Sequence, residues 1–144
     1  NSSVLSNLCN YAHIHKKCPA HFIKNKEILP SEIVHKIIDE LANNSFHGTI
    51  SFHVYNEPLI DPRLFWFIEY AKKRIPNSKI EIYSNGYYLD NQMINELENI
   101  GTDILIVTGY GDLEYNRLIN LEVDICYNIL YGNLDERIDN YKER

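Results

Sequence analysis

Cysteine and histidine gather near the start of the chain, in a pattern that could bind iron or zinc. Cys9 and Cys18 bracket a segment that also holds His13 and His15. Thiolate and imidazole are the ligands that zinc sites and iron–sulfur clusters take from proteins. The chain has three cysteines in all. This odd number argues against a disulfide framework and favours a reducing compartment, so we expect a cytoplasmic protein.

Polar residues also follow three predicted strands. Asn56 and Glu57 come after the second strand, Ser84 and Asn85 close the third, and Thr108 ends the fourth. Taken singly, each segment is typical of an ordinary turn. In a parallel sheet, however, ligands bind beyond the carboxyl ends of the strands. The segments that follow the strands are therefore where a ligand would be expected, and for Glu57 the functional alternative to a turn is a carboxylate directed at a cationic group.

The elements that must position these residues alternate between strand and helix. Apolar spacing, caps and turn residues define them. The alternation predicts an α/β fold with a parallel sheet and right-handed crossovers. Residues 9 to 30 lack periodicity and are predicted to form a long loop, which is usually functional or disordered. We expect strands at about 3–8, 49–54, 79–83, 103–107 and 123–130, and helices at about 31–41, 61–75, 90–100, 115–119 and 134–144. Ser31, Asp61 and either Asp90 or Asn91 are expected to cap the starts of the first three helices, and Gly101 to end the third.

Length and charge restrict the classes of function. The 144 residues suit one compact domain spanning 1–144. The net charge of −6 comes without a basic stripe, which disfavours nucleic acid as a partner. No apolar run approaches the ~20 residues that span a bilayer, so we expect no membrane partner. The chain starts at Asn1 and ends in a charged stretch, and we expect a fragment of something longer.

The strand-end motifs together resemble the radical S-adenosylmethionine (SAM) superfamily. Residues 50–64, ISFHVYNEPLIDPRL, resemble the segment in which a strand ends in Gly-Gly-Glu-Pro or Gly-x-Gly-Glu-Pro, followed by Leu-x-Asp-Pro. Residues 80–86, IEIYSNG, resemble the third strand with its Ser/Thr-Asn-Gly end, and residues 103–108 resemble the fourth. The order and spacing agree as well, so the resemblance covers roughly residues 3 to 130.

This resemblance implies an open partial (βα) barrel of about five strands with crossover helices. It implies a 4Fe–4S cluster after the first strand, held by three cysteines, with SAM on the fourth iron. Reductive cleavage of SAM would give a 5′-deoxyadenosyl radical that abstracts hydrogen from a substrate, either a small molecule or a peptide. An electron donor such as flavodoxin or ferredoxin is implied as a partner.

The resemblance also assigns roles to the strand-end residues. Asn56 and Glu57 would receive the SAM amine. Ser84 and Asn85 would contact its ribose or carboxylate, and Thr108 would contact the same region.

The cluster loop departs from the family pattern, which is Cys-x3-Cys-x2-Cys. Cys9 matches the first cysteine and Cys18 the third, with a lengthened loop between them. His13 or His15 could supply the missing ligand, because histidine replaces cysteine in some iron–sulfur centres. Cys126 is another candidate, although a free cysteine is more often a buried core residue. A Cys2His2 zinc site, a cluster with fewer ligands, or no cluster remain alternatives.

The sequence therefore leaves two alternative functions open. One is a radical SAM enzyme, favoured by Glu57 and Asn85 at the strand ends. The other is a degenerate module that binds SAM or metal without catalysis, favoured by the incomplete cysteine motif. His53, near a strand end, is either an interior residue with a hydrogen-bond partner or a group near SAM or substrate. The uncovered side of the open barrel is expected to receive the substrate or a partner domain.

Overall fold

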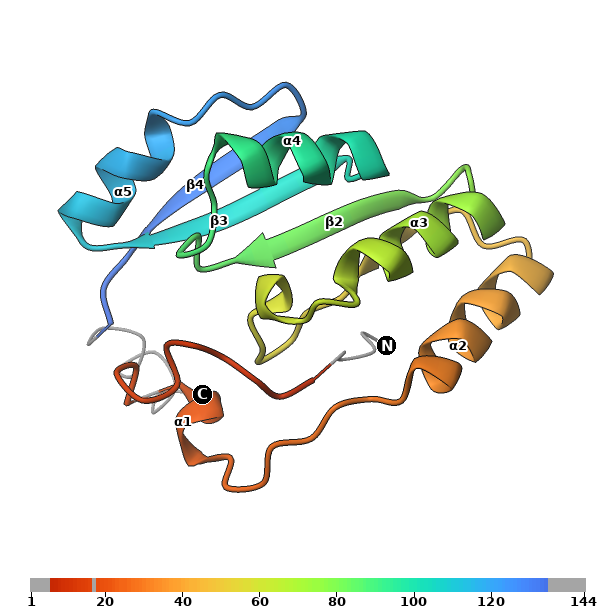
Figure 1. Cartoon of the computed structure of the whole chain (residues 1–144), viewed down its shortest axis with the longest axis horizontal. Coiled ribbons are helices and arrows are strands. Elements are labelled where there is room, and N and C mark those ends of the chain that lie inside the picture. Colours follow the sequence, from red (N-terminus) through yellow and green to blue (C-terminus); the bar gives the residue numbers. More distant parts are fainter. Residues whose placement is uncertain (1–5, 17, 135–144) are drawn as a thin grey trace.

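The computed structural model describes residues 6–16 and 18–134, and Figure 1 shows how their elements are arranged. Helices and strands alternate along most of this length, as the sequence predicts. The elements are α1 (Pro19–Phe22), α2 (Ser31–Asn43), β1 (Thr49–Ser51), the 3-10 helix η1 (Pro58–Ile60), α3 (Leu64–Arg74), β2 (Lys79–Ser84), α4 (Asn91–Ile100), β3 (Ile104–Tyr110), α5 (Asp112–Ile119) and β4 (Cys126–Gly132).

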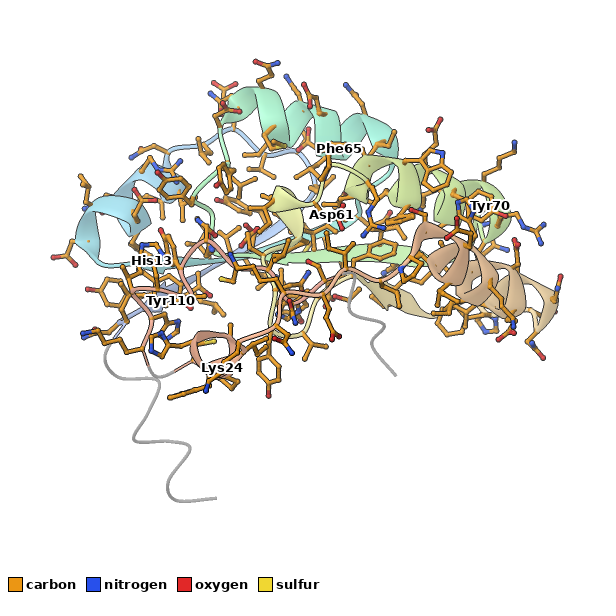
Figure 2. The ribbon with its side chains drawn as sticks, turned by 60° about the horizontal axis from the view of Figure 1, so that its bottom comes forward. His13, Lys24, Asp61, Phe65, Tyr70 and Tyr110 are labelled. Atoms are coloured by element: carbon orange, nitrogen blue, oxygen red, sulfur yellow. The ribbon has the colours of Figure 1, made fainter. Side chains whose placement is uncertain are left out.

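In the described part of the chain the strands form one parallel sheet of four, in the order β1-β2-β3-β4. Spatial order therefore follows chain order. A doubly wound sheet would reverse direction at a switch point, whereas winding in one direction places successive helices on the same face. Figures 1 and 2 both show α3 and α4 on one side of the sheet. The predicted parallel α/β fold is confirmed.

The hydrophobic core lies between the sheet and these helices. Alternate strand residues point into it, because successive side chains of a strand face opposite sides. Ile82 and Leu105 have no exposed surface, and neither have Phe67 of α3 and Leu97 of α4, which belong to the same buried cluster. The intervening strand residues point to the other face of the sheet.

Side-chain hydrogen bonds and glycine conformation determine where α4 begins and ends. The side chain of Asp90 accepts a hydrogen bond from the Met93 N–H, and Gly101 ends α4 with a φ of 113°. Both were expected from the sequence. At α2 the helix begins at Ser31 itself rather than after it. The Ser31 hydroxyl instead accepts a hydrogen bond from Arg63.

The prediction of about five strands is wrong for the described residues. Within the expected strand 3–8, Ser6 forms only an isolated antiparallel bridge with Ile28, and residues 3–5 lie outside the described part. The strand expected at 49–54 ends at Ser51, because the Asn56 side chain bonds to the backbone at Phe52 and Val54. The helix expected at 134–144 lies almost wholly outside the described residues.

Other boundaries moved by a few residues. β3 extends to Tyr110, so Thr108 lies within the strand rather than after it. α3 begins at Leu64, three residues after Asp61, whose carboxylate instead pairs with Arg63 at 2.7 Å. The long loop contains the four-residue helix α1. Among the helices of the described residues, none has the length and apolar character needed to cross a membrane.

Candidate functional site

A cavity of about 510 Å³ opens at the carboxyl ends of the strands. Small-molecule sites in proteins are typically about 300–1,000 Å³. The parallel topology brings to this cavity residues from the N-terminal loop and from the ends of β1, β2 and β3. Nine of the residues singled out from the sequence line it: Cys9, His15, Cys18, His53, Asn56, Glu57, Ser84, Asn85 and Thr108.

Glu57 is buried at the centre of this edge, with 2% of its surface exposed. Its Oε1 accepts hydrogen bonds from the Ser84 hydroxyl at 2.8 Å and the Leu59 N–H at 3.2 Å. Its Oε2 accepts the Asn85 N–H at 2.7 Å. A carboxylate offers about four acceptor positions, so about one is left for a ligand. Glu57 therefore joins the segment after β1 to the end of β2.

The burial of Glu57 also affects its ionisation. Desolvation raises its pKa to about 7, and the hydrogen bonds from Asn85, Ser84 and Leu59 lower it only in part. Burial disfavours the charged form of an acid, whereas donors to the carboxylate favour it. Near neutral pH this carboxyl group therefore exchanges between its two protonation states, and an approaching cation would favour the ionised one.

The Ser-Asn-Gly segment builds a turn through its own side chains. The Ser84 hydroxyl accepts the Gly86 N–H at 2.9 Å, and the Asn85 Oδ1 accepts the Tyr87 N–H at 3.0 Å. Gly86 has a φ of 74°, which favours glycine. The Asn85 amide also donates to Asn10 Oδ1 at 2.7 Å, which ties the turn to the N-terminal loop.

The N-terminal loop crosses the carboxyl ends of the strands. The Glu57 N–H donates to the Leu8 carbonyl at 2.8 Å. Tyr11 is buried, and its ring meets Tyr110 of β3 edge-on, with centroids 5.6 Å apart. The ring of His15 meets the same Tyr110 at 5.4 Å. These contacts hold the loop against the end of β3.

The predicted metal ligands separate into two groups. Cys9, Cys18 and His15 line the cavity, and both cysteines are free thiols. Burial raises the pKa of the Cys9 thiol, while backbone hydrogen bonds lower it in part. His13 is exposed and does not line the cavity. Cys126 is exposed at the amino end of β4, opposite Ile104, the first residue of β3.

In residues 6–16 and 18–134, no three His, Cys, Asp or Glu side chains come together as ligands of one metal ion. The zinc alternative therefore gains no support. The ligands of an iron–sulfur cluster bind different iron atoms and need wider spacing. Two thiols and an imidazole around one cavity fit that requirement by their chemistry.

For His53 the sequence left two interpretations open, and Arg117 carries no local pattern that indicates a role. His53 stacks on Tyr83 with ring centroids 4.7 Å apart, and both line the cavity. Arg117 of α5 donates to the Gly86 and Leu89 carbonyls at 2.6 Å each, which fixes the turn after β2. Tyr110 lines the cavity as well.

No protein-family model matches the chain. Its sequence is similar to the S-adenosyl-L-methionine-dependent 2-deoxy-scyllo-inosamine dehydrogenase of Niallia circulans, with 30% identity over 100 residues. That match covers 68% of this chain and 40% of the dehydrogenase. The chain therefore spans less than half the length of this relative.

Solved structures agree with the sequence comparison. The crystal structure of BtrN in complex with AdoMet and 2-DOIA matches with a TM-score of 0.74 and 23% identity, over 88% of this chain and 54% of BtrN. Selenomethionine BtrN in an open conformation matches with a TM-score of 0.69 and 24% identity, over 89% and 53%. The chain thus shares the α/β fold of BtrN and is related in sequence to a SAM-dependent dehydrogenase.

Proposed function

We propose that this chain is the SAM-binding, open partial (βα) barrel of a radical SAM enzyme. The observation that carries the proposal is the cavity itself. Cys9 and Cys18 of the cluster loop meet Glu57, Ser84 and Asn85 of the strand ends around one space of about 510 Å³. The sequence similarity to a SAM-dependent dehydrogenase supports the same cofactor.

The cluster would be held by Cys9 and Cys18 together with one further protein ligand. SAM would lie along the ends of β2 and β3, near Ser84 and Thr108. When bound, the cluster and SAM supply the one-electron cleavage chemistry of this superfamily. The protein contributes placement and electrostatics.

The residues at the strand ends would have different roles in binding SAM. Glu57 retains about one acceptor position and would use it for an N–H of the SAM amine. Both ends of the Asn56 amide bond to the local backbone, to the Val54 N–H and the Phe52 carbonyl. Asn56 would therefore position Glu57 by closing the turn, in place of the contact with the SAM amine that the resemblance implies. The Asn85 backbone and side chain link this network to the cluster loop.

The substrate would enter beside His53 and Tyr83, on the sheet face that points away from the helices. A small molecule is favoured over a peptide, because the relative is a dehydrogenase of 2-deoxy-scyllo-inosamine. An electron donor such as flavodoxin or ferredoxin, and a cytoplasmic location, complete the proposal.

A second candidate is a degenerate module that binds SAM without cleaving it. Two observations favour it: the loop has two cysteines, and Cys126 lies at the opposite end of the sheet. Such a module would keep the Glu57 network and lack a cluster.

The test is turnover by anaerobically reconstituted, dithionite-reduced protein, with formation of 5′-deoxyadenosine and methionine followed by chromatography. The radical SAM enzyme predicts both products, and predicts their loss in Cys18→Ser. Cys126→Ser is the matched control and should keep activity. SAM binding without either product would establish the degenerate module.

A further inference from the structure

The third ligand of the cluster is missing from the cysteine pattern, and three side chains could replace it. The fold distinguishes among them. His13 is exposed and outside the cavity lining. Cys126 begins β4 opposite the first residue of β3, so it lies at the amino end of the sheet, away from the cluster loop. His15 lines the cavity that Cys9 and Cys18 also line.

We propose that His15 is the third protein ligand, giving the set Cys9, His15 and Cys18. This inference rests on the proposed function and names the ligand that the function requires. Imidazole is an established ligand of iron in iron–sulfur centres.

The backbone supports this assignment. The His15 N–H donates to the Tyr11 carbonyl at 2.7 Å, and the Cys18 N–H donates to the His15 carbonyl at 3.0 Å. These two hydrogen bonds hold the backbone at His15 and at Cys18, and both residues line the same cavity. The ligand positions are fixed by hydrogen bonds that do not depend on the metal group.

The side chain of His15 is also held in place. It is buried, with 3% of its surface exposed, and its ring meets Tyr110 edge-on at 5.4 Å. Tyr110 is the last residue of β3, so this contact fixes the imidazole at the carboxyl end of the sheet. Ligands that are held by packing bind with little further ordering.

The spacing agrees with the geometry. Two residues separate His15 from Cys18, as two residues separate the last two cysteines of Cys-x3-Cys-x2-Cys. Five residues separate Cys9 from His15, in place of three. The departure from the family pattern is therefore confined to the interval between Cys9 and His15. The interval between His15 and Cys18 has the length that the family pattern has.

The experiment is pulsed electron paramagnetic resonance on reconstituted, dithionite-reduced protein. It is done without SAM, because the SAM amine would add a second nitrogen to the cluster. The expected result is a strongly coupled ¹⁴N signal in the wild-type protein. His15→Cys should keep iron and sulfide at the wild-type content and lose the ¹⁴N signal. The matched variant His13→Cys should keep both the wild-type content of iron and sulfide and the ¹⁴N signal.

A third variant tests the need for a ligand. His15→Ala should lose most of the iron and sulfide, with folding checked by circular dichroism. If His15→Ala does not fold, the comparison of His15→Cys with His13→Cys still decides whether His15 is the third ligand. A wild-type cluster without ¹⁴N coupling, or coupling that survives in His15→Cys, would overturn the assignment while the proposed function stands. Failure of the wild-type protein to assemble any cluster would overturn the proposed function itself.

Discussion

The backbone N–H of Asn85 donates a 2.7 Å hydrogen bond to the buried carboxylate of Glu57, across 28 positions of sequence. The Ser84 hydroxyl donates to the same carboxylate. Two motifs that follow different strands thus bind each other before any ligand arrives. The strand-end network has a structural role as well as a proposed binding role, and the two roles can be tested separately.

The first prediction concerns the pH dependence of stability. Burial raises the pKa of Glu57 from 4.5 to about 7, so the fold favours its protonated form. This contribution to stability is fully present below about pH 4.5 and is lost as the pH rises through about 7. Glu57→Gln should remove that part of the pH dependence. Denaturant unfolding of the wild-type protein and of Glu57→Gln from pH 4 to 8 measures this difference. If the free energy of unfolding changes with pH in the same way in both proteins, the raised pKa of Glu57 is contradicted.

Glu57→Gln should also weaken the network. The new amide group would face the Asn85 N–H, so two donors would meet where a donor and an acceptor met. We expect a loss of about 1–3 kcal/mol in the free energy of unfolding. SAM affinity of the wild-type protein should rise with pH through about 7, because the ionised carboxylate attracts the amine. Calorimetric titration of the variant should show a weaker and flatter dependence.

The second prediction concerns the hydroxyl of Ser84. Ser84→Ala removes a donor to Glu57 and the acceptor for the buried Gly86 N–H. We expect a loss of about 1–3 kcal/mol, since buried polar groups are left unsatisfied. Ser78→Ala is the control: Ser78 is also buried, and its hydroxyl has no hydrogen-bond partner among the described residues. Equal losses for the two variants would contradict a special role for Ser84.

The third prediction concerns the turn after β2. Gly86 has a φ of 74°, and an added Cβ would lie 2.8 Å from Leu118. Gly86→Ala therefore combines a strained backbone with a steric clash. Gly111 has a φ of 87° and no atom within 4 Å of the added Cβ. Gly111→Ala should cost about 1–3 kcal/mol for the backbone alone, because a φ of 87° with a ψ of 166° lies in a region essentially restricted to glycine. Gly86→Ala adds the clash with Leu118 to its strained backbone and should cost more. Thermal unfolding compares the two variants. A larger loss of stability in Gly111→Ala than in Gly86→Ala would show that the contact with Leu118 contributes little.

The fourth prediction concerns the cluster loop. Tyr110→Ala removes the edge-on contacts to Tyr11 and His15. Each such contact contributes about 0.5–1.5 kcal/mol. Amide hydrogens of residues 12–18 should exchange faster in the variant, as measured by mass spectrometry. Tyr88→Ala, whose ring contacts Tyr87, is the control and should leave exchange in the loop unchanged. Unchanged exchange in Tyr110→Ala would mean that the loop is held by other contacts.

The sequence predicts the parts of this fold that depend on periodicity and caps. The parallel alternation, the Asp90 cap and the Gly101 helix end are all local signals. The meeting of Glu57, Ser84 and Asn85 follows from the rule that parallel strands end at one edge. These predictions need no knowledge of distant contacts.

The remainder depends on contacts between distant residues. Asn10 reaches Asn85 across 75 positions, and Arg117 reaches Gly86 across 31. Neither residue carries a local pattern that indicates this role. The early end of β1 depends on the Asn56 side chain, which takes up backbone groups that a longer strand would use. The sequence also left His13 or His15, and less favourably Cys126, as candidates for the third ligand, and of these three the fold places His15 at the cavity.

The central claim is that the cavity holds a cluster with an open iron that SAM ligates. Continuous-wave electron paramagnetic resonance of reconstituted, dithionite-reduced protein, with and without SAM, tests it most directly. A radical SAM enzyme should give a reduced 4Fe–4S signal whose g values change when SAM is added. A protein that binds SAM but shows no such signal, with zinc or no metal by elemental analysis, would contradict it.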